Sequence, residues 1–326
     1  MENLQCFAFK HHDDSVRRVS SSGGAFSALA EAIISDGGVV YGAFLDDDDL
    51  TLRHIRVDRI DDLAKLRGSK YLQSSVGDTF RQAQEDLSQG KTVLYCGTPC
   101  QIAGLKRAVK DKKGMLYTCD LICHGVTSPL IWKEFVAYKE RQLGSRIIGA
   151  SFRDKTQHPW SECKEVVFTK QGRDNGIDAH SADEYAQIFY GHEAMRPSCY
   201  RCRFTNLNRP GDLTLGDFWG VEKAMPEIYD ELGVSFVLQN SKRGAELIQI
   251  LTQKGMIIPA ELSETRQPQL YKPVRKPFSR KWFWNTYKTK GLDKVIQDNR
   301  NPHSLINLSR NTVSGGKKLL RRLLRR

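Results

Sequence analysis

The stretch between residues 91 and 153 constrains the fold more than any other part of the chain, because strand-like and helix-like patterns alternate there with short links. Strands that alternate with helices pair in parallel, and the helices cover the sheet. We therefore predict an α/β fold with a mostly parallel or mixed sheet and flanking helices. The predicted strands span 91–96, 115–122 and 147–152, and the predicted helices span 100–110 and 129–143.

Weaker patterns extend this prediction to the rest of the chain. A helix with apolar residues at helical spacing follows the Ser/Gly-rich stretch 20–24, and strands are expected at 39–45 and 50–57. Beyond about residue 155 the pattern loosens into loops before a smaller α+β region closes the fold. Its predicted elements are strands at 212–215 and 234–239 and a helix at 241–254. This organisation divides the chain into regions 1–155, 156–300 and 301–326.

The formal net charge of +12 is at first sight typical of a nucleic-acid-binding protein. Seven of these charges come from residues beyond position 309, where no acidic residue occurs, and subtracting 7 from 12 leaves +5 for the rest of the chain. Apart from the segment 281–284, the basic residues are scattered rather than interleaved with aromatic ones. Nucleic-acid binding therefore ranks last among the functions that the sequence allows, and we expect no such partner.

The distribution of apolar and cysteine residues predicts a cytoplasmic protein with reduced thiols. No apolar run is long enough to cross a bilayer, and the first residues lack the basic and apolar stretches of a signal peptide. Thiols stay reduced in that compartment, so the eight cysteines are expected to serve as metal ligands, catalytic groups or buried core residues.

Four of the eight cysteines occupy positions suited to metal binding. Cys199 and Cys202 form a C-x-x-C pair on a predicted turn, which supplies half of a four-ligand site. Cys100 lies in the first turn of a predicted helix, which favours the thiolate form that a metal needs. Cys123 follows a predicted strand, at the kind of sheet edge where α/β folds place their ligands. Cys96 and Cys119 lie inside apolar strands and are better interpreted as buried core residues.

Three short stretches could bind a phosphate or a ring. The segments 21–24 and 97–101 present free backbone N–H groups at helix starts, where phosphates bind, although helix capping alone explains either pattern. Thr98 is the expected N-cap of the helix predicted at 100–110. The third segment, 67–71, places a lysine and a tyrosine beside a flexible turn.

Taken in order, these motifs resemble those of the beta subunits of deazaflavin (coenzyme F-420) hydrogenases and dehydrogenases, including bacterial relatives. The resemblance runs from about residue 15 to 240. It is carried by the segments 21–25, 67–71, 97–101, 123–125, the C-x-x-C pair and 211–217.

The resemblance implies an iron–sulfur flavoprotein oxidoreductase, or a redox subunit of one, that binds FAD and one [4Fe–4S] cluster. Region 1–155 would bind the flavin and region 156–300 would complete the cluster site. The implied cluster ligands are Cys100, Cys123, Cys199 and Cys202. The implied flavin-binding residues are Ser22, Gly23, Gly24, Gly68, Ser69, Lys70, Tyr71, Thr98 and Gln101.

Two further residues lie close to these motifs. His124 is a candidate catalytic residue that would handle a proton near the flavin, and a loop histidine that bonds only to the backbone is the alternative. Asp217 is expected to order the loop that carries the C-x-x-C pair, because aspartates flanked by glycine favour turns.

The implied partners are a small-molecule hydride donor or acceptor and a separate ferredoxin or redox subunit. Many bacterial relatives begin with a ferredoxin-like segment rich in cysteine, whereas residues 1–20 here contain only Cys6. A different class of protein also fits the cysteines: four thiols can hold structural zinc in a transferase that binds a nucleotide or sugar phosphate.

The end of the chain has a pattern of its own. On a helix, the leucines of segment 317–326 would form one apolar stripe with basic residues opposite. Such a helix can lie on the inner face of an anionic membrane, which makes peripheral membrane contact a further expectation. A solvated tail and docking on an acidic partner are the alternatives.

Overall fold

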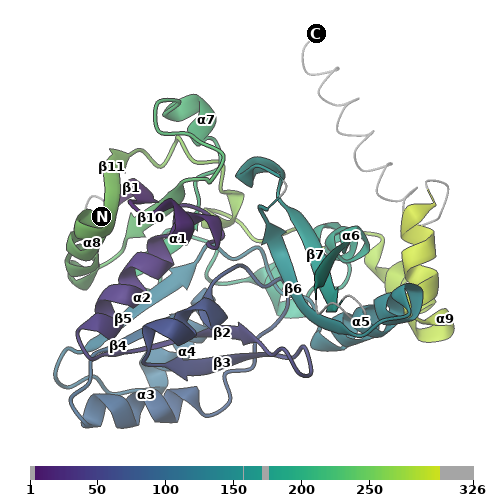
Figure 1. Ribbon diagram of the computed structural model, residues 1–326, viewed down its shortest axis with the longest axis horizontal. Helices are drawn as coiled ribbons and strands as arrows, with labels where there is room; N and C mark the ends of the chain where they lie inside the picture. Colours follow the sequence, from purple (N-terminus) through teal and green to yellow (C-terminus); the bar gives the residue numbers. More distant parts are fainter. Residues whose placement is uncertain (1–3, 157, 171–175, 302–326) are drawn as a thin grey trace.

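The computed structural model describes residues 4–156, 158–170 and 176–301 and contains one large and one small β-sheet (Figure 1). The large sheet has the strand order β11-β1-β10-β9-β5-β4-β2-β3. Its strands are β1 (Gln5–His11), β2 (Val39–Leu45), β3 (Leu52–Val57), β4 (Val93–Gly97), β5 (Leu116–Leu121), β9 (Leu213–Asp217), β10 (Ser235–Gln239) and β11 (Gly255–Ala260).

The centre of the large sheet is parallel and its flanks are antiparallel. Strand β4 lies between β2 and β5, and β5 pairs with β9, all in parallel. The pairs β2–β3, β9–β10, β10–β1 and β1–β11 are antiparallel. Because parallel strands share a direction, the chain leaves β4, β5 and β9 at the same edge of the sheet, where α/β folds bind ligands.

Helices cover both faces of the parallel centre. Apolar side chains of α2 (Ala25–Ser35) and α8 (Lys242–Lys254), such as Leu29 and Leu247, form one core with the sheet. Those of α3 (Thr79–Ser88) and α4 (Pro99–Ala108) form a second core on strands β2, β4 and β5. The short helices α1 (Asp14–Arg18), α7 (Val221–Ala224), η1 (Ile60–Leu66), η2 (Trp160–Glu162), η3 (Pro197–Arg201) and η4 (Pro268–Leu270) lie in the connections.

The small sheet and the helices that pack on it lie beside the large sheet (Figure 1). The small sheet is antiparallel, with the order β6 (Ile147–Asp154), β7 (Lys164–Lys170) and β8 (Ile177–Ser181). The small sheet and three helices together form an aromatic core, whose centre contains Trp132, Phe135 and Tyr185. The three helices are α5 (Pro129–Leu143), α6 (Asp183–Gly191) and α9 (Arg280–Arg300).

The predicted mixed sheet with flanking helices is confirmed, but two local predictions are wrong. The strand expected at 147–152 forms as β6 yet pairs with β7 instead of joining the large sheet, because the apolar face of α5 packs into the aromatic core. The loops expected beyond residue 155 include the strands β7 and β8 and the helix α6.

The sequence-based regions map onto this architecture in different ways. The large sheet takes strands from both sides of residue 155, so a division there separates strands that pair with one another. Apart from Asn301, the predicted basic tail at 301–326 lies outside the described residues. Within the described part of the chain, no helix is long and apolar enough to cross a membrane.

A buried ion pair ties the loop after η3 to the centre of the large sheet. Arg209 donates to Asp120 on β5 at 2.6 Å, and the two side chains are 1% and 0% exposed. Asp120 also accepts hydrogen bonds from the Gly211 amide at 2.8 Å and the Thr214 hydroxyl at 2.9 Å. Arg209 donates to the Leu121 carbonyl at 2.7 Å, so both charges have several partners.

Replacing Arg209 by methionine should lower the free energy of unfolding by about 3–5 kcal/mol, because it leaves the Asp120 carboxylate buried without its cation. The free energy of unfolding is measured by urea denaturation, with circular dichroism as the probe. The matched control is Arg141→Met, because Arg141 and Asp293 pair at 2.9 Å with 61% and 53% of their side chains exposed. That change should cost about 0–1 kcal/mol. Equal losses in the two variants would contradict the prediction.

Candidate functional site

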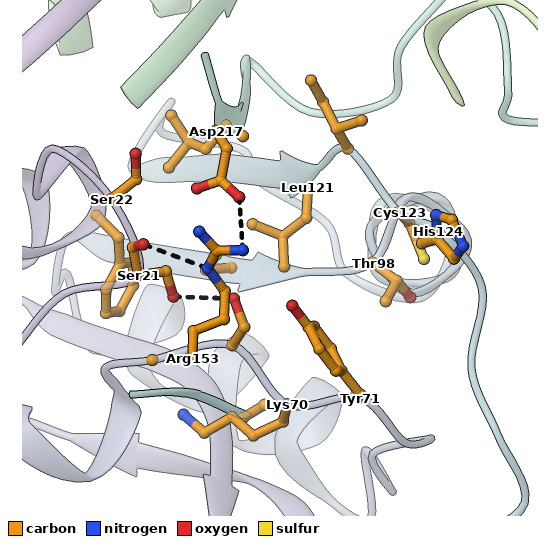
Figure 2. Close-up of a pocket in the computed structure, with 18 of the residues that line it drawn as sticks. Ser21, Ser22, Lys70, Tyr71, Thr98, Leu121, Cys123, His124, Arg153 and Asp217 are labelled. Atoms are coloured by element: carbon orange, nitrogen blue, oxygen red, sulfur yellow. Dashed lines mark hydrogen bonds and ion pairs between the residues drawn. The ribbon is translucent and has the colours of Figure 1, made fainter. Parts of the chain in front are cut away.

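A cavity of about 560 Å³ opens at the edge of the large sheet where β4, β5 and β9 end. Its volume lies within the range of about 300–1,000 Å³ that is usual for ligand and cofactor sites. Figure 2 shows Ser21 and Ser22 on one side of it, Thr98, Cys123 and His124 together on the other, and Arg153 between them. The cavity therefore joins segments that are far apart in the sequence.

The first side of the cavity is formed by the start of α2. Gly24 precedes this helix with a φ of 91°, a left-handed conformation that favours glycine. The Ser21 hydroxyl contacts the Ser69 hydroxyl at 2.9 Å, which joins this turn to the segment after η1. Backbone N–H groups at the start of a helix are suited to bind an anion.

Lys70 and Tyr71 continue this side of the cavity. The ammonium of Lys70 donates to the carbonyls of Leu66 at 3.0 Å and Arg67 at 2.7 Å. Removal from water lowers the pKa of Lys70 to about 7, despite an opposing contribution from Cys96. The Tyr71 ring stacks on Phe189 with 4.3 Å between centroids, which connects the cavity to helix α6 of the small-sheet layer.

The opposite side is formed by the turns after β4 and β5. The Thr98 amide donates to the Gln101 side chain at 2.9 Å, which caps α4 as the sequence predicts. His124 contacts the ring of His192 with 2.6 Å between their Nε2 atoms. Burial, and to a smaller extent the neighbouring imidazole of His192, lowers the pKa of His124 to about 4.

Arg153 and Asp217 form the middle of the cavity wall. Arg153, at the end of β6, pairs with Asp217 at 3.4 Å (Figure 2). Its guanidinium also lies 5.2 Å from the centre of the Trp219 ring. Asp217 also accepts from the Trp160 indole at 3.3 Å, so it anchors this wall rather than the loop of the C-x-x-C pair. Arg153 is not among the site residues expected from the sequence. The sequence feature that could have identified Arg153 is its position directly after the strand predicted at 147–152, because ligand sites lie at the ends of parallel strands.

The four predicted metal-binding cysteines come from three segments that meet beside the cavity. Cys100 lies in the first turn of α4, Cys123 follows β5, and Cys199 lies in η3 shortly before Cys202. Burial, and to a smaller extent the nearby thiols of Cys199, Cys100 and Cys202, raise the pKa of Cys123 to about 12. The four thiols are therefore close enough to influence one another electrostatically.

Backbone contacts hold the loop after β5 against the segment that contains the C-x-x-C pair. The Arg196 amide donates to the Val126 carbonyl at 2.9 Å. Gly125 has a φ of 114°, and a Cβ there would lie 2.6 Å from the Met195 sulfur and 3.4 Å from the Cys199 Cβ. Only glycine allows the two segments to approach this closely.

Comparison with known proteins identifies the family of this chain. The family model for the C-terminal part of the coenzyme F420 hydrogenase/dehydrogenase beta subunit matches residues 90–265, which is more than half of the chain. The chain belongs to this family of hydrogenase and dehydrogenase subunits. No curated protein matches the chain at a significant level.

A solved structure has the fold of this family member. It is a chain of the F420-reducing [NiFe] hydrogenase complex from Methanosarcina barkeri, which aligns with a TM-score of 0.54 and 19% sequence identity. The alignment covers 96% of this chain and 92% of that chain. At this identity the likeness supports the fold.

The predicted site residues of this family member fall into three groups. The residues that line the cavity are Ser22, Gly24, Gly68, Ser69, Lys70, Tyr71, Thr98, Gln101, Cys123 and His124. Gly23 is absent from the lining, because it packs against the backbone of Phe9 and Ser235. Cys100, Cys199 and Cys202 lie beyond the cavity wall, and within the described residues no three His, Cys, Asp or Glu side chains converge closely enough to bind one metal ion.

Two other cysteines have the role that the sequence assigns to them. Cys96 and Cys119 are paired neighbours on the parallel strands β4 and β5, and both are buried in the core. Burial raises the pKa of Cys96 to about 12. Thiols in such surroundings are unreactive, so these two residues act as core residues.

Proposed function

We propose that this family member is an iron–sulfur flavoprotein oxidoreductase, or the redox subunit of one, with FAD in the cavity and one [4Fe–4S] cluster on Cys100, Cys123, Cys199 and Cys202. The observation that carries the proposal is that one cavity extends from the start of α2 and Lys70 to Cys123. A flavin in this cavity would adjoin the group held by the cysteines. The small molecule with which it reacts would be a hydride donor or acceptor.

The cavity has the features that a flavin nucleotide requires. The N–H groups at the start of α2 and the Lys70 ammonium suit a pyrophosphate, and the apolar side chains of Leu121 and Tyr71 suit a ring. When bound, a flavin supplies hydride transfer and single-electron exchange. The protein's part is to hold and orient it, with Arg153 fixed in the wall by Asp217.

The four cysteines have the chemistry that an iron–sulfur cluster requires. A [4Fe–4S] cluster is held by four thiolates, each on a different iron, so its ligands need not converge on one point. The thiols of Cys100, Cys199 and Cys202 oppose ionisation of Cys123, and a cationic metal core would offset that repulsion. Gly125 follows Cys123 by two residues, and its lack of a side chain lets the loop after β5 lie directly against Met195 and Cys199.

His124 is the residue that we propose as catalytic. It borders the cavity next to Cys123, and its ring contacts His192 as well as the aromatic rings of Phe189 and Tyr190. These contacts hold the imidazole at the cavity wall, where it can give a proton to a bound ligand or take one from it.

Protein purified without oxygen should be brown-yellow, with one FAD and about four irons per chain. Changing Cys199 to serine should remove the iron and its visible absorbance but retain the flavin, because the two sites use different residues. Metal analysis and the visible spectrum measure both. Cys163→Ser, which alters a half-buried cysteine outside the set, should retain both groups. Colourless protein that contains zinc would favour the transferase alternative.

Lys70 should make FAD binding depend on pH. Its amine is charged below about pH 7 and neutral above, whereas the pyrophosphate of FAD stays ionised throughout. Titration of flavin-free protein should show affinity falling roughly tenfold between about pH 6 and pH 9. The Lys70→Met variant should bind more weakly at low pH and lose this dependence. The control Lys65→Met, which changes an exposed lysine paired with Asp62, should behave like the unmodified protein.

Changing His124 to alanine should leave the FAD and iron content unchanged and slow flavin reduction by roughly 10²–10⁴-fold, the usual contribution of a proton-transferring side chain. Stopped-flow bleaching of the flavin absorbance by a reduced deazaflavin measures the rate. His180→Ala is the control, because His180 contacts Thr169 within the small sheet. An unchanged rate in the His124 variant would return this residue to a structural role.

A further inference from the structure

We propose that a surface next to the C-x-x-C pair docks an acidic electron-carrier protein. This docking surface consists of the exposed cations Arg201, Arg203, Lys276 and Lys281 and the exposed rings of Phe278 and Trp282. The inference rests on the proposed function, because the partner would exchange electrons with the group at the cysteines. In that exchange one side loses an electron and the other gains it, and no bond forms or breaks.

The two segments of the docking surface are packed together through partly buried contacts. Arg280, at the start of α9, donates to the Met195 carbonyl at 3.0 Å and the Tyr200 hydroxyl at 2.9 Å. Its guanidinium also lies 5.2 Å above the Tyr200 ring. The Trp284 indole donates to the Glu193 carbonyl at 3.0 Å. Segment 274–284 is therefore a fixed border of the segment that contains Cys199 and Cys202.

The charge of both segments is uniformly positive. Residues 194–210 contain four arginines and no acidic residue, and residues 271–290 contain seven lysines and arginines and no acidic residue. Arg209 is neutralised by Asp120 inside the protein. The ion pairs among the described residues include none with Arg201, Arg203, Lys276 or Lys281. Cations that the protein leaves uncompensated are available to an acidic partner.

Apolar rings lie among these cations. Phe278 is 64% exposed and Trp282 is 41% exposed, and the Arg275 guanidinium lies 5.6 Å above the Phe278 ring. Aromatic residues and arginine are the residues most enriched at protein–protein interfaces. Electron-transfer partners form small contacts of this kind, since they must dissociate after each transfer.

The position of the docking surface favours a protein over the other anionic partners. Arg201 lies between Cys199 and Cys202 in the sequence, and Arg203 follows Cys202 directly. A partner that covers these arginines brings its own redox centre next to the cysteines. A nucleic acid or a membrane could bind the same cations, but neither carries a redox centre that must lie close to the cysteines.

The test measures binding of a small acidic ferredoxin to the full chain, with stopped-flow association rates at about 20 mM and 200 mM salt. The variant Lys276→Glu/Lys281→Glu reverses two charges on the docking surface. The matched control, Lys112→Glu/Lys113→Glu, makes the same change in the exposed turn between α4 and β5. That turn precedes β5, whereas Cys123 follows it, so the control lies at the opposite edge of the sheet. Residues 302–326 are the same in all three proteins.

We expect salt-sensitive association with the unmodified protein and the control, and a rate at least about tenfold lower for the docking-surface variant at low salt. Phe278→Ala should shorten the lifetime of the complex without changing the salt dependence. Equal binding by the two charge-reversed variants, absence of ferredoxin binding, or equally tight competition by single-stranded DNA or anionic vesicles would overturn the proposal. Visible spectra of the same samples report flavin and iron separately, so a failure of the proposed function is distinguishable from a failure of docking.

Discussion

The buried ion pair between Asp120 and Arg209 is the interaction on which the site geometry depends. Asp120 ends the buried part of β5, three residues before Cys123, and Arg209 follows Cys202 by seven residues. Two charges removed from water stabilise a fold only when they satisfy each other and have further hydrogen-bond partners, and both conditions are met here. Moving the segment of the C-x-x-C pair away from β5 would separate Arg209 from Asp120 and leave the Asp120 carboxylate buried without its cation. The position of Cys199 and Cys202 relative to β5 is therefore coupled to the stability of the sheet.

The features that could be predicted from the sequence are those encoded by neighbouring residues. Apolar periodicity and short links were sufficient for β4, α4, β5 and α5, and Thr98 and Pro99 marked the start of α4. Cys96 and Cys119 were identified as core residues because their neighbours in the sequence are apolar. Eight of the nine residues that the family resemblance implies around a flavin line the cavity, and they lie on short motifs that can be recognised from neighbouring residues.

The features that the sequence did not reveal depend on contacts between distant segments. Nothing within β6 specifies whether it pairs with β5 or with β7, since that choice depends on the aromatic face of α5. Arg153 reaches the cavity wall only because β6 leaves the large sheet, so an error in strand pairing concealed a site residue. The close approach of Gly23 to Phe9 likewise requires β1, a strand that was not predicted from the sequence.

The four cysteines of the proposed cluster site come from segments that belong to both sheet systems, and this origin would link folding to binding of a cluster. Cys100, at the start of α4, and Cys123 follow strands of the large sheet. The segment of Cys199 and Cys202 is held instead by Arg280 of α9, whose later turns pack in the core of the small-sheet layer. A group that bound all four thiols would join the two layers, and its binding free energy would add to the stability of the folded state. The contacts between the segments that carry the thiols would thus also determine how much a bound cluster stabilises the protein.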